Sequence, residues 1–137
     1  MERYLIVDDE EMGRYMLQAF LSEFALCDVA ENGNEALRLF EKAQLEGKPY
    51  DLLCVDLIMP GMNGIALIRK IRELERIDSV YVGVRSKIFV ITASDSAWDK
   101  ADLLLENLCD DYIVKPFNRE SLKDDLYKHE LGVPGRN

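Results

Sequence analysis

The stretch Leu52–Gly64, LLCVDLIMPGMNG, decides the fold. Its first four residues form a short apolar run bounded by polar residues, as buried parallel strands do. The run ends directly in Asp56, and Asn63-Gly64 is a helix start signal. Apolar residues then recur at helical spacing (Ile68, Ile71 and Leu74). The stretch therefore predicts a strand, a loop and a helix, with Asp56 at the carboxyl end of the strand.

The same alternation extends in both directions from this stretch. Four more short apolar runs predict strands: Tyr4–Val7, Leu26–Ala30, Ile88–Ile91 and Tyr112–Val114. Four more helical stripes accompany them: Met12, Met16, Ala19 and Phe20; Ala36, Phe40 and Ala43; Ala97, Ala101, Leu104, Leu105 and Leu108; Leu122 and Leu126. We interpret the stripes as core-facing surfaces, with Asn118 capping the last helix. Five β-then-α units predict an α/β fold, with an open, mostly parallel sheet between two layers of helices.

Length and composition limit the classes of protein. The 137 residues fit one domain, which we place at 1–130, followed by a flexible tail at 131–137. No apolar run is long enough to span a bilayer or to act as a signal peptide, so we expect no membrane insertion and a cytoplasmic location. The net charge of −9 disfavours direct binding to nucleic acid. Three widely spaced cysteines argue against disulfides and zinc, and we expect Cys27 and Cys54 to be buried thiols.

Polar groups end four of the five predicted strands. These are Asp8-Asp9, Asp56, Thr92-Ala93 and Lys115-Pro116. Each alone is more often a cap, a turn or a loop residue. Because the carboxyl ends of parallel strands meet at one edge of a sheet, the four together predict a site there.

The predicted site suits a hard divalent cation. Three neighbouring carboxylates repel one another unless a cation relieves them. Mg²⁺ takes one or two carboxylates and leaves positions for phosphate oxygens. Lys115 and Thr92 add an ammonium group and a hydroxyl that can bind a phosphoryl group. These are the parts that in-line phosphoryl transfer to a carboxylate requires.

Four segments resemble the receiver domains of two-component response regulators. They read YLIVDDEEM (4–12), LLCVDLIMPGMNG (52–64), IFVITAS (88–94) and DDYIVKPF (110–117), and the resemblance spans about residues 3–127. It implies a flavodoxin-like, doubly wound (βα)5 fold with strand order 2-1-3-4-5.

The resemblance also implies a role for each site residue. Asp56 is expected to accept the phosphoryl group, and Thr92 and Lys115 to bind it. Mg²⁺, or Mn²⁺ in its place, is expected to bind Asp9, Asp56 and the backbone carbonyl of Ile58, with Asp8 acting mainly through water. Three neighbours complete the pattern: the small residue Ala93, the switch aromatic Tyr112 and a cis Lys115-Pro116 bond.

The partners implied are a sensor histidine kinase or a histidine phosphotransfer protein as donor. A downstream protein target is expected on the face formed by the fourth helix, fifth strand and fifth helix, which includes Tyr112. Because the sequence ends soon after the fifth helix, we expect a stand-alone receiver or a fragment of a longer regulator.

Two departures from the family pattern lead to further hypotheses. The interval between Asp56 and Thr92 is longer than usual, with the excess at Arg76–Ser86. We favour a longer surface loop there; a sharper hypothesis makes Val80, Val82 and Val84 a strand extension or contact edge. Ile58 and Ser94 lack the groups that orient an attacking water, so we expect a long-lived phosphoryl state.

Three alternatives compete with the phospho-accepting switch. A Mg²⁺-dependent phosphohydrolase would need an Asp-x-Asp spacing after its first strand. A nucleotide-binding domain would need a glycine-rich phosphate loop, which no strand here precedes. A receiver-like module that binds partners without phosphorylation stays open. Two residues have simpler interpretations: Trp98 as a packing residue, and His129 as neither a phosphate carrier nor a metal ligand.

Overall fold

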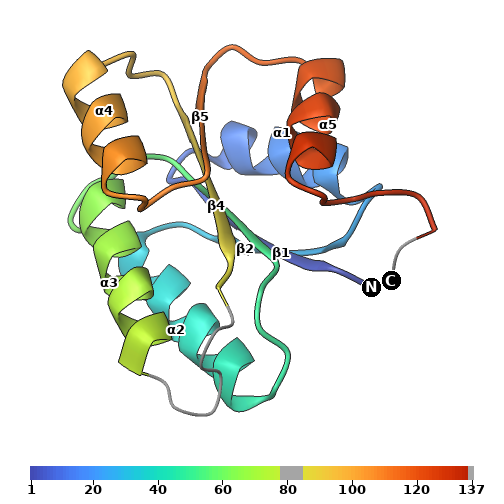
Figure 1. Cartoon of the computed structure of the whole chain (residues 1–137), viewed down its shortest axis with the longest axis horizontal. Helices are drawn as coiled ribbons and strands as arrows, with labels where there is room; N and C mark the ends of the chain where they lie inside the picture. Colours follow the sequence, from blue (N-terminus) through green and yellow to red (C-terminus); the bar gives the residue numbers. More distant parts are fainter. Residues whose placement is uncertain (78–84, 136–137) are drawn as a thin grey trace.

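Five parallel strands and five helices alternate along the chain in the computed structural model, which describes residues 1–77 and 85–135 (Figure 1). The elements are β1 (Arg3–Val7), α1 (Glu11–Leu21), β2 (Leu26–Ala30), α2 (Gly33–Leu45), β3 (Leu52–Val55), α3 (Gly64–Ile77), β4 (Lys87–Thr92), α4 (Ala97–Leu105), β5 (Asp111–Val114) and α5 (Arg119–Lys128). The strand order is β2-β1-β3-β4-β5. The predicted α/β fold and strand order are confirmed.

The register of the strands brings their carboxyl ends level. Val7, the last residue of β1, pairs with Ala30 on one side and Val55 on the other. Thr92 at the end of β4 pairs with Val114 at the end of β5. The residues that follow these strands therefore emerge along one edge of the sheet.

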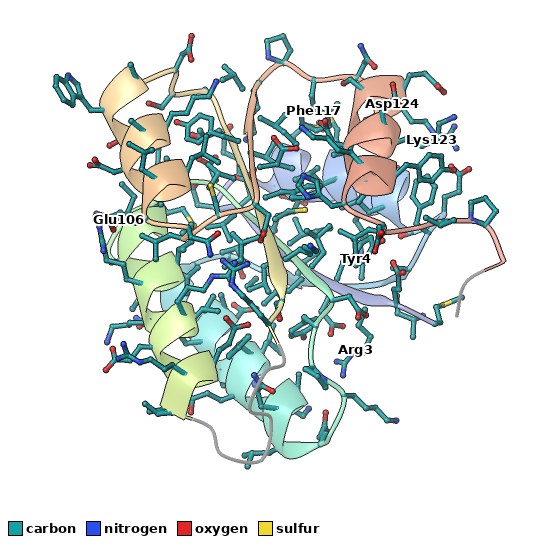
Figure 2. The ribbon with its side chains drawn as sticks, in the orientation of Figure 1. Arg3, Tyr4, Glu106, Phe117, Lys123 and Asp124 are labelled. Carbon is teal, nitrogen blue, oxygen red and sulfur yellow. The ribbon has the colours of Figure 1, made fainter. Side chains whose placement is uncertain are left out.

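Helices cover both faces of the sheet (Figure 1). One core cluster joins α2, α3 and α4 to one face, and a second joins α1 and α5 to the other. Strand side chains alternate between them, with Leu5 in the first cluster and Tyr4 in the second. Phe117, which follows the cis Lys115-Pro116 bond, packs edge-on against Phe20 of α1 in the second layer (Figure 2).

Asparagine side chains cap the starts of three helices, and at α3 (Gly64–Ile77) Asn63 Oδ1 accepts the Ala66 N–H at 2.9 Å. Asn32 Oδ1 accepts the Glu35 N–H at 2.8 Å at the start of α2. Asn118 Oδ1 accepts the Ser121 N–H at 2.8 Å, and the Ser121 hydroxyl completes a capping box at the start of α5. Such caps satisfy backbone donors that the first turn of a helix leaves free. The predicted Asn118 cap is confirmed.

Two of the predicted helix faces are wrong. In α1, Met12 and Met16 are exposed, and Leu17 and Leu21 face the sheet instead. The true face lies one position further along the helix, and α1 has apolar residues on both faces, so periodicity alone did not separate them. In α4, Leu105 is 85% exposed and only Leu103 is buried, because this short helix packs mainly against the edge strand β5.

Other predictions need adjustment. Trp98 is 82% exposed, so its interpretation as a packing residue is wrong. Cys54 is buried as expected, whereas Cys27 is only half-buried on the edge strand β2. Leu131 is buried and the Gly132 N–H donates to Glu2 Oε1 at 3.0 Å, so the expected tail begins in contact with the domain. The hypothesis for Val80, Val82 and Val84 lies outside the described residues.

Candidate functional site

Three carboxylates and an ammonium group gather where β1, β3 and β5 end. Asp8 and Asp9 follow β1, Asp56 follows β3, and Lys115 follows β5. One carboxylate oxygen each from Asp8, Asp9 and Asp56 can be chosen so that all lie within 4.8 Å of one another. The structure thus brings together four of the residues that the strand ends predicted.

Lys115 ties the two buried carboxylates together. Its Nζ donates to Asp8 Oδ2 at 2.9 Å and to Asp56 Oδ2 at 3.2 Å. Burial by itself lowers the pKa of the Lys115 ammonium, but the hydrogen bond and charge of Asp8 and the charge of Asp56 outweigh it. The pKa of Lys115 therefore lies above its usual value, and the group stays charged.

Backbone amides fix the other oxygen of each buried carboxylate. The Glu10 N–H donates to Asp8 Oδ1 and the Ile58 N–H to Asp56 Oδ1, both at 3.0 Å. Asp8 and Asp56 are 1% and 6% exposed, whereas Asp9 is exposed. Two of the acids are therefore held rigidly, and the third faces solvent.

The donor set fits Mg²⁺. All three groups are hard carboxylate oxygens, and Lys115 bonds to only two of them. Two buried acids and one exposed acid keep an excess of negative charge that a divalent cation relieves. Ile58 is 63% exposed, and its backbone N–H donates to Asp56 Oδ1. The expected role of the Ile58 backbone carbonyl as a metal ligand stays a prediction.

Thr92 and Tyr112 lie on the neighbouring strands. Thr92 is fully buried at the end of β4, and its hydroxyl oxygen accepts the Ser94 N–H at 3.4 Å. Tyr112 of β5 points inward, and its hydroxyl donates to the Ser94 carbonyl at 2.8 Å. Burial raises the pKa of the Tyr112 hydroxyl. Both side chains therefore meet at Ser94, in the loop that follows β4.

Two residues of α1 that the sequence did not single out also belong to the site. The Arg14 guanidinium donates to the backbone carbonyl of Asp8 at 2.9 Å. Gly13 lies directly against the Asp8 carboxylate. The sequence signal for these two residues was their position one turn after the Asp8-Asp9 pair. A helix that follows a strand folds back beside the end of that strand, so its first turn lies near the site.

No helix within residues 1–77 and 85–135 combines the length and apolar character that a membrane crossing needs.

The chain is similar in sequence to known regulatory proteins. The transcriptional regulatory protein ResD of Bacillus subtilis is 37% identical over 117 residues, which cover 85% of this chain and 42% of ResD. The response regulator ArlR of Staphylococcus epidermidis is 35% identical over 123 residues, covering 89% of this chain and 49% of ArlR. The chain thus spans less than half the length of these relatives.

Solved structures share the fold over almost all of the chain. The response regulator TrrA of Thermotoga maritima, in complex with Mg²⁺-BeF, is 33% identical with a TM-score of 0.71, covering 93% of this chain and 98% of TrrA. The chemotaxis protein CheY4 of Vibrio cholerae is 28% identical with a TM-score of 0.76, at the same coverages. The response regulator receiver domain model matches residues 4–127. The chain therefore belongs to the response regulator receiver domain family.

Proposed function

We propose that this receiver domain is a switch in which Asp56 accepts a phosphoryl group in a Mg²⁺-dependent reaction. One observation carries the proposal: the buried Asp56 carboxylate lies 3.2 Å from Lys115 Nζ and beside the carboxylates of Asp8 and Asp9. A nucleophile, a cation and a set of metal-binding oxygens at one point are what phosphoryl transfer needs.

The transfer itself uses Asp56 as nucleophile. One carboxylate oxygen attacks phosphorus, an O–P bond forms, and the donor's N–P bond breaks with its electron pair left on the donor nitrogen. Lys115 then binds a phosphoryl oxygen in place of the Asp56 oxygen that it holds now. A bound Mg²⁺ supplies positive charge that reduces repulsion between the carboxylates and the incoming phosphoryl group.

Asp9, Asp56 and the Ile58 carbonyl are the proposed direct ligands of the metal, with Asp8 acting mainly through water. Mn²⁺, which also prefers oxygen ligands, is proposed as a substitute. The donor is proposed to be a histidine kinase or a histidine phosphotransfer protein, as the family implies. Cytoplasmic location and a domain of residues 1–130 stay predictions.

The proposed response runs through Thr92 and Tyr112. The phosphoryl group adds strong hydrogen-bond acceptors, toward which the Thr92 hydroxyl moves. Because Thr92 and Tyr112 both bond to Ser94, this movement changes the loop before α4. The face formed by α4, β5 and α5 is then the proposed contact for a downstream protein. Trp98, which is exposed on α4, is proposed to report the change through its fluorescence.

The direct test is intact-mass analysis after incubation with Mg²⁺ and acetyl phosphate. We expect one added phosphoryl group in the wild type, none without Mg²⁺ and none in Asp56→Asn. The exposed-acid variant Asp124→Asn (Figure 2), which loses the same charge on α5, controls for charge and is expected to be modified normally. A wild type that acquires no adduct and binds no beryllofluoride would make a partner-binding module without phosphorylation the better interpretation.

The same assay measures the lifetime of the adduct. Ile58 places an exposed apolar side chain beside Asp56, and Ser94 offers no carboxylate or amide to orient a water. We therefore propose slow self-dephosphorylation. Loss of the adduct within seconds after acetyl phosphate is removed contradicts this part of the proposal.

A further inference from the structure

Gly13 of α1 leaves space that the Asp8 carboxylate occupies. A Cβ atom built on Gly13 would lie 2.4 Å from Asp8 Oδ2, 3.1 Å from Cγ and 3.5 Å from Oδ1. Separations below 3.0 Å essentially never occur for real Cβ atoms, so a side chain here forces something to move. The nearest group is the carboxylate itself rather than the backbone.

The Asp8 carboxylate has little freedom to move aside. Oδ2 accepts Lys115 Nζ at 2.9 Å, and Oδ1 accepts the Glu10 N–H at 3.0 Å. The residue is 1% exposed, and the Arg14 guanidinium bonds to its carbonyl. These bonds therefore oppose a rotation of the carboxylate away from a Cβ at Gly13.

Glycine is an unfavourable choice inside a helix. It loses more backbone freedom on folding than alanine does. Gly13 occupies the first turn of α1 with both neighbours helical. A local benefit at the site explains its presence better than the needs of the helix do.

We propose that Gly13 is a positioning residue, which holds the Asp8 carboxylate where it serves both Lys115 and a divalent cation. The inference rests on the proposed function for its cation part. Gly13 has no side chain that could bind the metal or the phosphoryl group, so its proposed action runs through Asp8.

The test is a double-mutant cycle of wild type, Gly13→Ala, Asp8→Ala and the double variant. Mg²⁺ affinity is measured by calorimetry. We expect Gly13→Ala to weaken Mg²⁺ binding about ten-fold, as loss of groups that orient metal ligands does. Gln18→Ala, on an exposed face of the same helix, controls for a helical substitution to alanine and is expected to leave the affinity unchanged.

Two readouts need no metal. The Glu10 amide proton bonds to Asp8 Oδ1. We expect its NMR chemical shift to change when Gly13→Ala is made in the wild type, but not when it is made in Asp8→Ala. Alanine favours a helix more than glycine does, so we expect Gly13→Ala to raise the urea midpoint of Asp8→Ala, which lacks the carboxylate that a Cβ would meet. In the wild type, we expect the same substitution to raise the midpoint less or to lower it. Failure of Gly13→Ala alone to fold, with a folded double variant, counts as the same result.

Other outcomes overturn the inference. If Gly13→Ala changes the urea midpoint and the Glu10 amide chemical shift by the same amounts in the wild type and in Asp8→Ala, Gly13 does not position Asp8. If the wild type binds Mg²⁺ and Gly13→Ala binds it equally well, the inference fails and the proposed function stands. If the wild type binds no Mg²⁺, the proposed function fails, and the metal-free readouts still decide whether Gly13 positions Asp8.

Discussion

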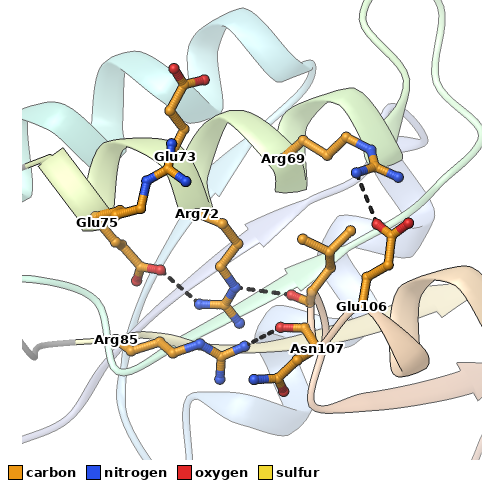
Figure 3. Close-up of a pocket in the computed structure, with 9 residues that line it drawn as sticks. Arg69, Arg72, Glu73, Glu75, Arg85, Glu106 and Asn107 are labelled. Atoms are coloured by element: carbon orange, nitrogen blue, oxygen red, sulfur yellow. Dashed lines mark hydrogen bonds and ion pairs between the residues drawn. The ribbon is translucent and has the colours of Figure 1, made fainter.

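The two edges of the sheet carry buried charges in opposite ways. At the carboxyl edge, three carboxylates lie close together, and the one ammonium group beside them, Lys115, bonds only to Asp8 and Asp56. At the amino edge, a second cluster lies between α3 and the starts of β4 and β5 (Figure 3). It contains two arginines, Arg72 and Arg85, and two carboxylates, Glu75 and Asp110.

Each charged side chain of the amino-edge cluster has a hydrogen-bond partner. Arg72 donates to the Glu75 and Asp110 carboxylates and to the carbonyls of Leu108 and Ser86, at 2.7–3.2 Å. Glu75 Oε2 accepts the Ser86 N–H at 2.7 Å, and Arg85 reaches Asp110 at 3.1 Å. Positive and negative charges balance, and backbone groups fill the remaining bonds.

This difference separates a structural cluster from a functional one. A buried ion pair with every bond made adds specificity and needs nothing further. Carboxylates in excess repel one another and favour a cation from outside. We therefore expect the acidic edge to be the one that responds to a ligand, although both clusters join strands far apart in sequence.

The largest expected effect comes from breaking the balanced cluster. Arg72→Ala leaves Glu75 and Asp110 buried without their main cation, and we expect it to lower the free energy of unfolding by about 3–5 kcal/mol. Urea unfolding measures the loss. A change below about 1 kcal/mol would show that the cluster is a surface network rather than a structural one.

The next effect concerns the unbalanced edge. Mg²⁺ at ten times its dissociation constant is expected to raise the free energy of unfolding of the wild type by about 1.4 kcal/mol. Asp9→Asn removes an exposed carboxylate from the cluster and is expected to lose most of this gain. Urea unfolding with and without Mg²⁺ measures it. Equal gains in both proteins would exclude Asp9 as a ligand.

The pH dependence of Lys115 gives a smaller effect. Because its pKa is raised above the usual 10.5, its stabilisation is fully present below that pH and is lost as the pH rises through the folded-state value. The difference in free energy of unfolding between wild type and Lys115→Met is therefore expected to narrow above about pH 10.5. A difference that stays constant between about pH 8 and 11.5 contradicts the raised pKa.

The smallest effect is expected at Arg69, one turn before Arg72 on α3. Arg69 pairs with Glu106 at 2.9 Å, but both side chains are about half exposed (Figure 3). Arg69→Ala is expected to change the free energy of unfolding by about 0–1 kcal/mol, since water screens such pairs. It is thus the matched control for Arg72→Ala, and equal losses in both variants would remove the distinction between the two pairs.

The strand ends were the strongest signal in the sequence. The order of polar groups after Val7, Val55 and Val114 placed Asp8, Asp56 and Lys115 together, because parallel strands deliver their ends to one edge. The faces of α1 and α4 were not predictable in the same way. Met12, Met16 and Leu105 fit a helical period but project away from the sheet, and only packing against the strands decides which side is buried.

The amino-edge cluster also escaped prediction. Arg72 and Glu75 look like an ordinary surface pair on α3, and Asp110 looks like the start of a strand. Their burial depends on where α3 crosses the ends of β4 and β5, which a linear pattern does not contain. The same holds for Gly13, whose importance lies in one distance to Asp8.

The contact of Gly132 with Glu2 has a topological consequence. The two ends of the domain lie side by side, since the Gly132 N–H donates to Glu2 and Leu131 packs in the same core cluster as Tyr4. A short peptide that joins these ends and a new opening in the exposed turn after α2 would give a circular permutant. Asp8, Asp56 and Lys115 would still meet at one edge, in a different order along the chain.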